Sequence, residues 1–141
     1  MTATITPTAT TTVRSASTPT VWRSGLTAGL VAAGATSAVA ATAHALGVSL
    51  ETAPGEAIPI AGFAQLTLFF TAVGVLMARV MGRRARRPRT TFVKTTVVLT
   101  ALSFVPDVVL NAGVATKLTL VLTHMVAAAV VIPALSSRLS D

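Results

Sequence analysis

Cysteine is absent and charged residues are scarce, and each shortage excludes a class of function. With no cysteine among its 141 residues, the chain cannot exchange disulfides, use a thiolate nucleophile, or hold an iron–sulfur cluster or cysteine-bound zinc. Charged residues make up 11% of the chain, whereas soluble domains average about 25%. Hydrophobic residues make up 52%. This composition predicts an integral membrane protein that forms one compact bundle.

Four apolar runs are long enough to cross a bilayer as helices, which takes about 20 residues. They occupy residues 24–50, 58–78, 95–113 and 118–135. We therefore predict an all-α, four-helix transmembrane bundle over residues 21–139. Residues 1–20 are rich in threonine and alanine and show no period that could build a core, which predicts a disordered cytoplasmic tail.

Basic residues gather between the second and third apolar runs. Gly82 and Pro88 are expected to break any helix there, which predicts a loop over residues 79–94. The basic residues of this segment are Arg79, Arg83, Arg84, Arg86, Arg87, Arg89 and Lys94. Of the eleven Lys and Arg residues in the chain, all but Lys117 fall on the same side of the predicted membrane. The positive-inside rule then predicts that both termini are cytoplasmic, in the inner or plasma membrane.

The basic segment has two interpretations. It either sets the topology alone or also attracts anionic lipid headgroups. The net charge of +7 does not indicate nucleic-acid binding, because orientation in the membrane accounts for the basic residues.

The first apolar run also has the three-part pattern of a cleaved signal peptide. Arg23 precedes an apolar core that ends at Ala41-Thr42-Ala43. The run is longer than the ~7–15 residues typical of such a core, and it continues past the supposed cleavage site. We therefore predict that it is retained as a span.

Four strongly polar side chains fall inside the spans at similar predicted depth. They are His44, Gln65, Asp107 and His124, one in each span. At about 1.5 Å per residue, each lies roughly 10 Å below the outer surface. One polar residue per helix is the arrangement that a convergent site in the bundle would need.

Asp107 is the most costly residue in the chain. An aspartate in mid-membrane costs about 2.5–3.5 kcal/mol, so this one must be protonated, paired or hydrated. Pro106 beside it lacks a backbone donor and is expected to kink the helix. Polar side chains recur along this span at spacings of three and four, which predicts one inward-facing stripe: Thr96, Thr100, Ser103, Asp107 and Asn111.

The polar cluster has several possible uses. It either hydrogen-bonds the helices together, or binds a polar ligand or passes protons, since an imidazole with a pKa near 6.5 changes charge around neutral pH. Haem between His44 and His124, or a metal held by both histidines and Asp107, needs ligand types that are present. Ser103 lies near Asp107, but sequence places no base beside it. No catalytic residue, cofactor or metal is therefore assigned.

Gly25 and Gly29 form a small-xxx-small pair that lets another helix approach closely. The pair favours packing within the bundle, and dimerisation is the alternative. A second copy of the chain or another membrane protein is therefore a possible partner, besides the lipid bilayer itself.

Two short motifs complete the pattern. They are Ser103-x-x-Pro106-Asp107 and the stretch from Leu122-Thr123-His124 to Ile132-Pro133. With the four spans and the arginine-rich central segment, they resemble a family of uncharacterised small four-span membrane proteins from high-GC bacteria. The resemblance covers about Val21 to Leu139. It implies a four-helix integral membrane protein and carries over no catalytic residue.

We predict a non-enzymatic membrane protein whose bundle packs or associates within the membrane, with the four polar residues as its polar core. The alternative is a protein that handles small molecules or protons through the same residues, and the third possibility is a bis-histidine haem electron carrier. Asp107→Asn separates the first two, because a structural cluster tolerates the amide whereas a proton-handling site loses its function.

Overall fold

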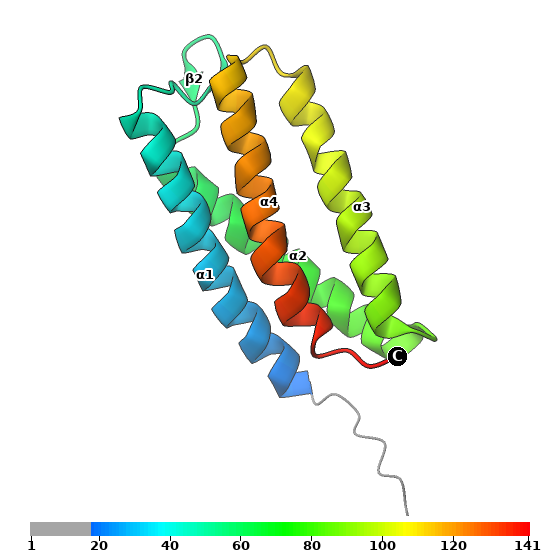
Figure 1. Ribbon diagram of the computed structural model, residues 1–141. Coiled ribbons are helices and arrows are strands. Elements are labelled where there is room, and N and C mark those ends of the chain that lie inside the picture. The colour runs from blue at the N-terminus through cyan, green and yellow to red at the C-terminus, as the bar shows by residue number, and fades with distance from the viewer. Residues whose placement is uncertain (1–17) are drawn as a thin grey trace, which may run out of the picture.

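The computed structural model describes residues 18–141 as four long helices and one small hairpin (Figure 1). The helices are α1 (Thr18–Ala45), α2 (Ile60–Arg84), α3 (Pro88–Val109) and α4 (Val114–Ser136), and antiparallel strands β1 (Glu51–Ala53) and β2 (Glu56–Ala57) join α1 to α2. Residues 1–17, most of the predicted disordered tail, lie outside the described residues. The tail was predicted to reach residue 20, which was wrong, because residues 18–20 already belong to α1.

All four helices are long and apolar enough to cross a membrane. Large apolar side chains such as Leu26, Phe69, Leu102 and Val109 are exposed along their outer surfaces. In water this much exposed apolar surface would favour aggregation, whereas lipid chains cover it without cost. The predicted all-α, multi-span membrane fold is thus confirmed, and its orientation stays a prediction.

The basic segment is mostly helical, so the prediction of a loop over residues 79–94 was wrong. α2 continues through Gly82 to Arg84, and α3 begins at Pro88, which leaves residues 85–87 as the connection. A glycine inside a helix costs only about 1 kcal/mol, and the Leu139 side chain packs against the Gly82 backbone. Proline lacks the N–H that a helix interior uses but suits the first turn, where Pro88 lies.

The basic residues still share one end of the bundle, which we call the basic end. Arg23 lies near the start of α1, Arg84 ends α2, Arg89 lies in the first turn of α3, and Arg138 follows α4. Because consecutive helices run in opposite directions, the start of α1, the end of α2, the start of α3 and the end of α4 all lie at the lower end of the bundle in Figure 1. The hairpin lies at the opposite end.

The connection from α1 to α2 is fixed to the bundle by a buried leucine. α1 ends at Ala45, five residues before the predicted end of the first span, and Gly47 follows it with φ +88°. Leu50 also has a positive φ, of 57°, and its side chain is buried against Ala40 and Phe63. Burial of this side chain offsets the backbone strain.

Helix α1 packs closely on α2 because two glycines remove side chains from the contact. A Cβ atom on Gly25 would overlap the Val75 side chain, and one on Gly29 would lie 3.1 Å from Thr71 Cγ2. The small-xxx-small pair therefore packs within the bundle, as the favoured interpretation held.

The buried core divides into two clusters, one at each end of the bundle. At the basic end, Phe92 and Leu135 pack with Val21, Val75, Ala78 and Leu139. At the hairpin end, Leu50, Phe63 and Leu120 pack with Ala40. Between the clusters, α2, α3 and α4 surround a cavity.

The start of α3 is capped by a carboxylate that lies far away in the sequence. The Thr90 backbone N–H donates to Asp141 Oδ1 at 3.1 Å, and the Thr90 hydroxyl donates to Asp141 Oδ2. Both bonds hold the pKa of the Asp141 carboxyl below its ordinary value. A carboxylate here satisfies backbone donors at a helix N-terminus that would otherwise be unpaired.

We expect Asp141→Asn to lower the thermal stability of the bundle at neutral pH but not in strong acid. Because the pKa is depressed in the folded protein, the carboxylate stabilises the fold above the ordinary carboxyl pKa, and this contribution is lost as pH falls through the depressed value. Melting curves of the detergent-purified wild type and variant across acidic pH measure this contribution. Glu56→Gln, which changes an exposed acid of the hairpin, is the control. A difference between Asp141→Asn and wild type that did not shrink in acid would contradict this role.

Candidate functional site

An apolar cavity of about 430 Å³ lies between α2, α3 and α4. Its walls carry aromatic and aliphatic side chains, among them Phe63, Phe70, Met77 and Leu99, and small residues from α4. This volume lies within the range of small-molecule sites, about 300–1,000 Å³. The three helices form an open cavity large enough for a small ligand.

The predicted polar stripe of α3 lies along one wall of this cavity. Thr96, Thr100 and Ser103 line it, whereas Asn111 is exposed beyond the end of α3. Each of the three hydroxyls donates to a carbonyl one turn earlier, at 2.8 Å for Thr96 to Phe92, 2.8 Å for Thr100 to Thr96 and 2.6 Å for Ser103 to Thr100. Their donors are therefore satisfied within the helix, and only their lone pairs remain for a ligand.

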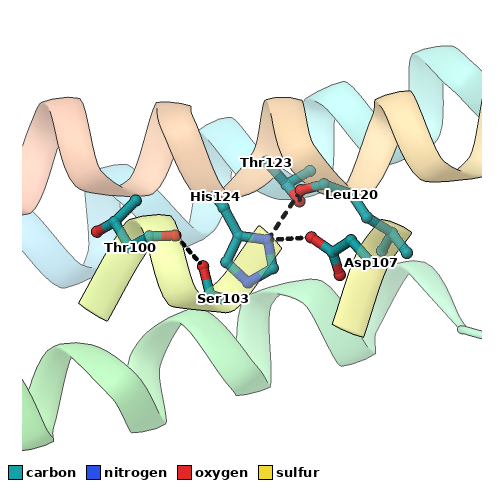
Figure 2. Close-up of polar contacts among 6 residues, drawn as sticks. All are labelled: Thr100, Ser103, Asp107, Leu120, Thr123 and His124. Atoms are coloured by element: carbon teal, nitrogen blue, oxygen red, sulfur yellow. Dashed lines mark hydrogen bonds and ion pairs between the residues drawn. The ribbon is translucent and has the colours of Figure 1, made fainter. Parts of the chain in front are cut away.

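Asp107 and His124 meet across the α3–α4 interface (Figure 2). His124 Nδ1 lies 3.1 Å from Asp107 Oδ2 and 2.9 Å from the Leu120 carbonyl oxygen one turn earlier in α4. A carbonyl oxygen only accepts, so Nδ1 carries the proton and donates it to Leu120. Asp107 Oδ2 lies beside this nitrogen without a well-aligned hydrogen bond. The Leu120 carbonyl thus fixes which ring nitrogen is protonated.

The Asp107 carboxylate is buried and incompletely satisfied. The residue is 5% exposed, and its Oδ2 atom accepts no well-aligned hydrogen bond, because the Nδ1 proton is directed to Leu120. The 3.1 Å contact with His124 Nδ1 is therefore its main compensation within the described residues. A buried oxygen of this kind in a native protein calls for a partner such as water or a ligand.

The second imidazole nitrogen, Nε2, is the chemically available atom. It points away from both Asp107 and Leu120 (Figure 2), and His124 lines the cavity. In a neutral ring whose Nδ1 carries the proton, Nε2 is a hydrogen-bond acceptor. The Phe104 ring packs edge-on against the imidazole, with centroids 6.3 Å apart and planes at 80°, and so helps to hold its orientation.

The structure brings together two of the four predicted cluster residues, and the expected convergence of all four was wrong. His44 lies in the last turn of α1 and Gln65 near the start of α2, and both are exposed. Neither lines the cavity. Within residues 18–141, neither side chain bonds to Asp107 or His124. Equal depth did not place them together because depth does not determine which way a helix is rotated.

The haem and metal alternatives lose their geometric basis for the same reason. A bis-histidine haem needs both imidazoles to face one space, whereas only His124 lines the cavity. Among the residues that the structure describes, no three His, Cys, Asp or Glu side chains come close enough to hold a metal ion.

Two residues near Asp107 take part in hydrogen bonds at the end of α3. The Lys117 Nζ donates to the Val108 carbonyl at 2.7 Å, which satisfies an acceptor there. Pro106 lies inside α3, which continues to Val109, and its carbonyl accepts from Leu110.

Sequence could not place a base near Ser103, but the structure shows that His124 lines the same cavity as Ser103. The side-chain types then match those of a Ser-His-Asp triad. The Ser103 hydroxyl, however, donates to the Thr100 carbonyl. Among the hydrogen bonds of residues 18–141, none joins Ser103 to His124. The Ser103 hydroxyl is thus already occupied within α3.

Sequence reasoning missed Phe104, the Leu120 carbonyl and the cavity itself. The carbonyl had a usable signal, because residues four apart in a helix lie one above the other. The cavity had none, since its apolar lining cannot be told from a lipid-facing surface by composition.

The comparisons with known proteins give a family and nothing beyond it. A model of a family of unknown function (DUF6069) matches residues 16–141. No curated protein and no solved structure matches the chain.

Proposed function

We propose, from the geometry of the cavity, that this chain binds a small, largely apolar molecule that enters from the lipid. The chain belongs to this family of unknown function, which assigns it no activity. The molecule carries one hydroxyl-type donor, which hydrogen-bonds to His124 Nε2. The protein holds its ligand without changing it chemically. The observation that carries this proposal is the cavity of about 430 Å³ with an imidazole on its wall.

The walls select the ligand by polarity. The cavity lining is mostly aliphatic and aromatic, so a charged molecule would lose its hydration without finding a partner. The threonine and serine hydroxyls on the cavity walls already donate to other groups of the protein. The ligand must therefore bring its own donor, and Nε2 is the acceptor whose orientation the surrounding residues fix.

The predicted polar core is compatible with this proposal but leaves the cavity unexplained. A pair that served only to join α3 to α4 would need no groove beside it. Passing protons would need a continuing chain of polar groups. Besides the hydroxyls of α3, the cavity walls carry those of Thr67, Thr71 and Thr123, and each of these already donates to another group of the protein.

We expect decanol to raise the melting temperature of the detergent-purified protein more than its methyl ether does at equal concentration. A ligand present at about 100 times its Kd stabilises the fold by ~2.7 kcal/mol, or roughly 5–10 °C for a chain of this size. The ether lacks the donor for Nε2 and should bind about fivefold more weakly, since a hydrogen bond contributes about 1 kcal/mol.

Two substitutions on α4 provide the matched test. Ala128→Phe fills the cavity, whereas Ala129→Phe adds the same ring to an exposed position that does not line it. The decanol shift should disappear in the first variant and persist in the second. Equal shifts in both variants, or equal shifts for alcohol and ether in wild type, would rule out this site.

The membrane and the orientation complete the proposal: the protein lies in the plasma membrane with its basic end in the cytoplasm. The distribution of Lys and Arg supports this. Because the chain has no cysteine, a single cysteine at Thr52 in the hairpin or at Ser140 can be labelled in intact cells. An impermeant maleimide should react with the first and not the second, and the reverse pattern would invert the topology. Association with other membrane proteins stays a prediction.

A further inference from the structure

The basic end carries a second, separate pocket between α1 and the residues that follow α4. It has a volume of about 340 Å³ and is lined by Thr20, Arg23, Ser24, Thr27 and Arg138. A hydrogen bond from Ser24 Oγ to the Ala134 carbonyl, at 3.0 Å, joins α1 to α4 beside it. The two arginines thus come from chain segments that the packing holds together.

The pocket concentrates positive charge that has no compensating carboxylate. Within the described residues, neither Arg23 nor Arg138 forms an ion pair, and each guanidinium offers five N–H donors. Two cations that line one pocket repel each other unless an anion lies between them. Asp141, the acidic residue nearest to Arg138 in the sequence, is already engaged with Thr90.

The remaining lining groups also favour an acceptor-rich ligand. The Thr27 hydroxyl donates to the carbonyls of Arg23 and Ser24, both at 3.1 Å, and the Ser24 hydroxyl is used on Ala134. The donors that remain unpaired on the pocket wall are therefore those of the guanidinium groups. Guanidinium forks match phosphate oxygens in a bidentate manner.

The surroundings point to a phosphate that is attached to a lipid. Leu26 and Leu30 follow Arg23 at spacings of three and seven, so they lie on the same face of α1, and they are 63% and 57% exposed. Trp22, half exposed, packs against Arg79 with the guanidinium 5.7 Å from the ring centre. An aromatic ring and arginines at a helix end are typical of headgroup level.

We propose that the Arg23–Arg138 pocket binds the phosphate of an anionic phospholipid, whose acyl chains lie along Leu26 and Leu30. This site is distinct from the cavity beside His124 and does not depend on the function proposed for it. It goes beyond general attraction by the basic segment, because two named arginines from different segments hold one headgroup.

Trp22 gives a local readout, because it is the only tryptophan in the chain and adjoins Arg23. The protein is reconstituted in phosphatidylcholine vesicles that contain a minor fraction of phosphatidylglycerol with brominated acyl chains, which quench nearby tryptophan. We expect quenching beyond that given by the same fraction of brominated phosphatidylcholine. The excess quenching measures the enrichment of phosphatidylglycerol near Trp22. The double variant Arg23→Gln/Arg138→Gln should reduce this enrichment about fivefold for each arginine removed, which is the fold-change equivalent to ~1 kcal/mol each.

A matched control loses the same charge elsewhere on the basic end. Arg83→Gln/Arg86→Gln changes two exposed arginines outside the pocket and should retain most of the enrichment. An equal loss in both double variants would overturn the pocket in favour of general charge attraction. Inorganic phosphate is then added to the wild-type vesicles: unchanged quenching supports a lipid headgroup, whereas competition at low concentration would identify free phosphate as the ligand and overturn the lipid assignment.

Discussion

We expect His124→Leu to destabilise the bundle by about 3 kcal/mol. The substitution leaves the Asp107 carboxylate, 5% exposed, without the imidazole nitrogen that lies 3.1 Å from it. Leaving a buried polar group without its partner costs ~1–3 kcal/mol, and the cost is at the upper end for a charged group. Reversible unfolding in mixed micelles containing increasing SDS measures the difference.

The partner substitution should behave differently, and this asymmetry identifies the cause. Asp107→Asn keeps an oxygen facing Nδ1 and removes the charge, so it should be neutral or mildly stabilising. The double variant His124→Leu/Asp107→Leu should recover most of the lost stability, because replacing both partners by apolar groups is nearly neutral. His44→Leu, which removes an exposed histidine, should have little effect. A double variant no more stable than His124→Leu would show that the imidazole acts through packing and not through the carboxylate.

The second large effect is expected where α1 meets α2. Gly25→Val should destabilise the bundle by about 1–3 kcal/mol, the usual cost of overpacking, because even a Cβ atom there overlaps the Val75 side chain. The clash involves a β-branched side chain with little rotamer freedom, so the helices must separate. The same SDS titration reports the loss.

The control and the rescue lie on the same two helices. Gly34→Val makes the same substitution in α1 where a Cβ atom has no neighbour within 4 Å, and should cost far less. Val75→Ala in the Gly25→Val background should restore part of the stability, because it opens the space that the new side chain needs. A full effect at Gly34 would assign the loss to the conformational preference of valine and not to the α1–α2 contact.

The fold was predictable because the membrane imposes it. Four apolar runs separated by charged or turn residues can satisfy their backbone groups in lipid only as helices, and four helices are present. The ends of the helices were less predictable. Hydropathy marks where an apolar run ends, whereas α2 continues through Gly82 to Arg84, since a helix needs no apolar side chains once its backbone bonds are made.

Sequence identified two of the residues at the site, and the misplacement of the other two has a physical reason. Asp107 and His124 stood out because polar groups inside a membrane need partners, and the stripe Thr96, Thr100 and Ser103 gave the rotation of α3. α1 and α2 have no comparable stripe, so the rotations of His44 and Gln65 were undetermined. Lipid and protein interior are equally apolar, so no hydrophobic pattern distinguishes the two faces of these helices.

The most direct test of the cavity is to map where a hydroxyl-bearing apolar probe attaches. A medium-chain alcohol with a diazirine in its chain is photolysed with the reconstituted protein, and mass spectrometry locates the adducts. The account predicts adducts on cavity residues such as Met77 and Val131. An excess of decanol should reduce these adducts, and they should be absent in Ala128→Phe but present in Ala129→Phe. Adducts confined to exposed positions such as Phe69 and Leu102, unaffected by decanol or by Ala128→Phe, would contradict it.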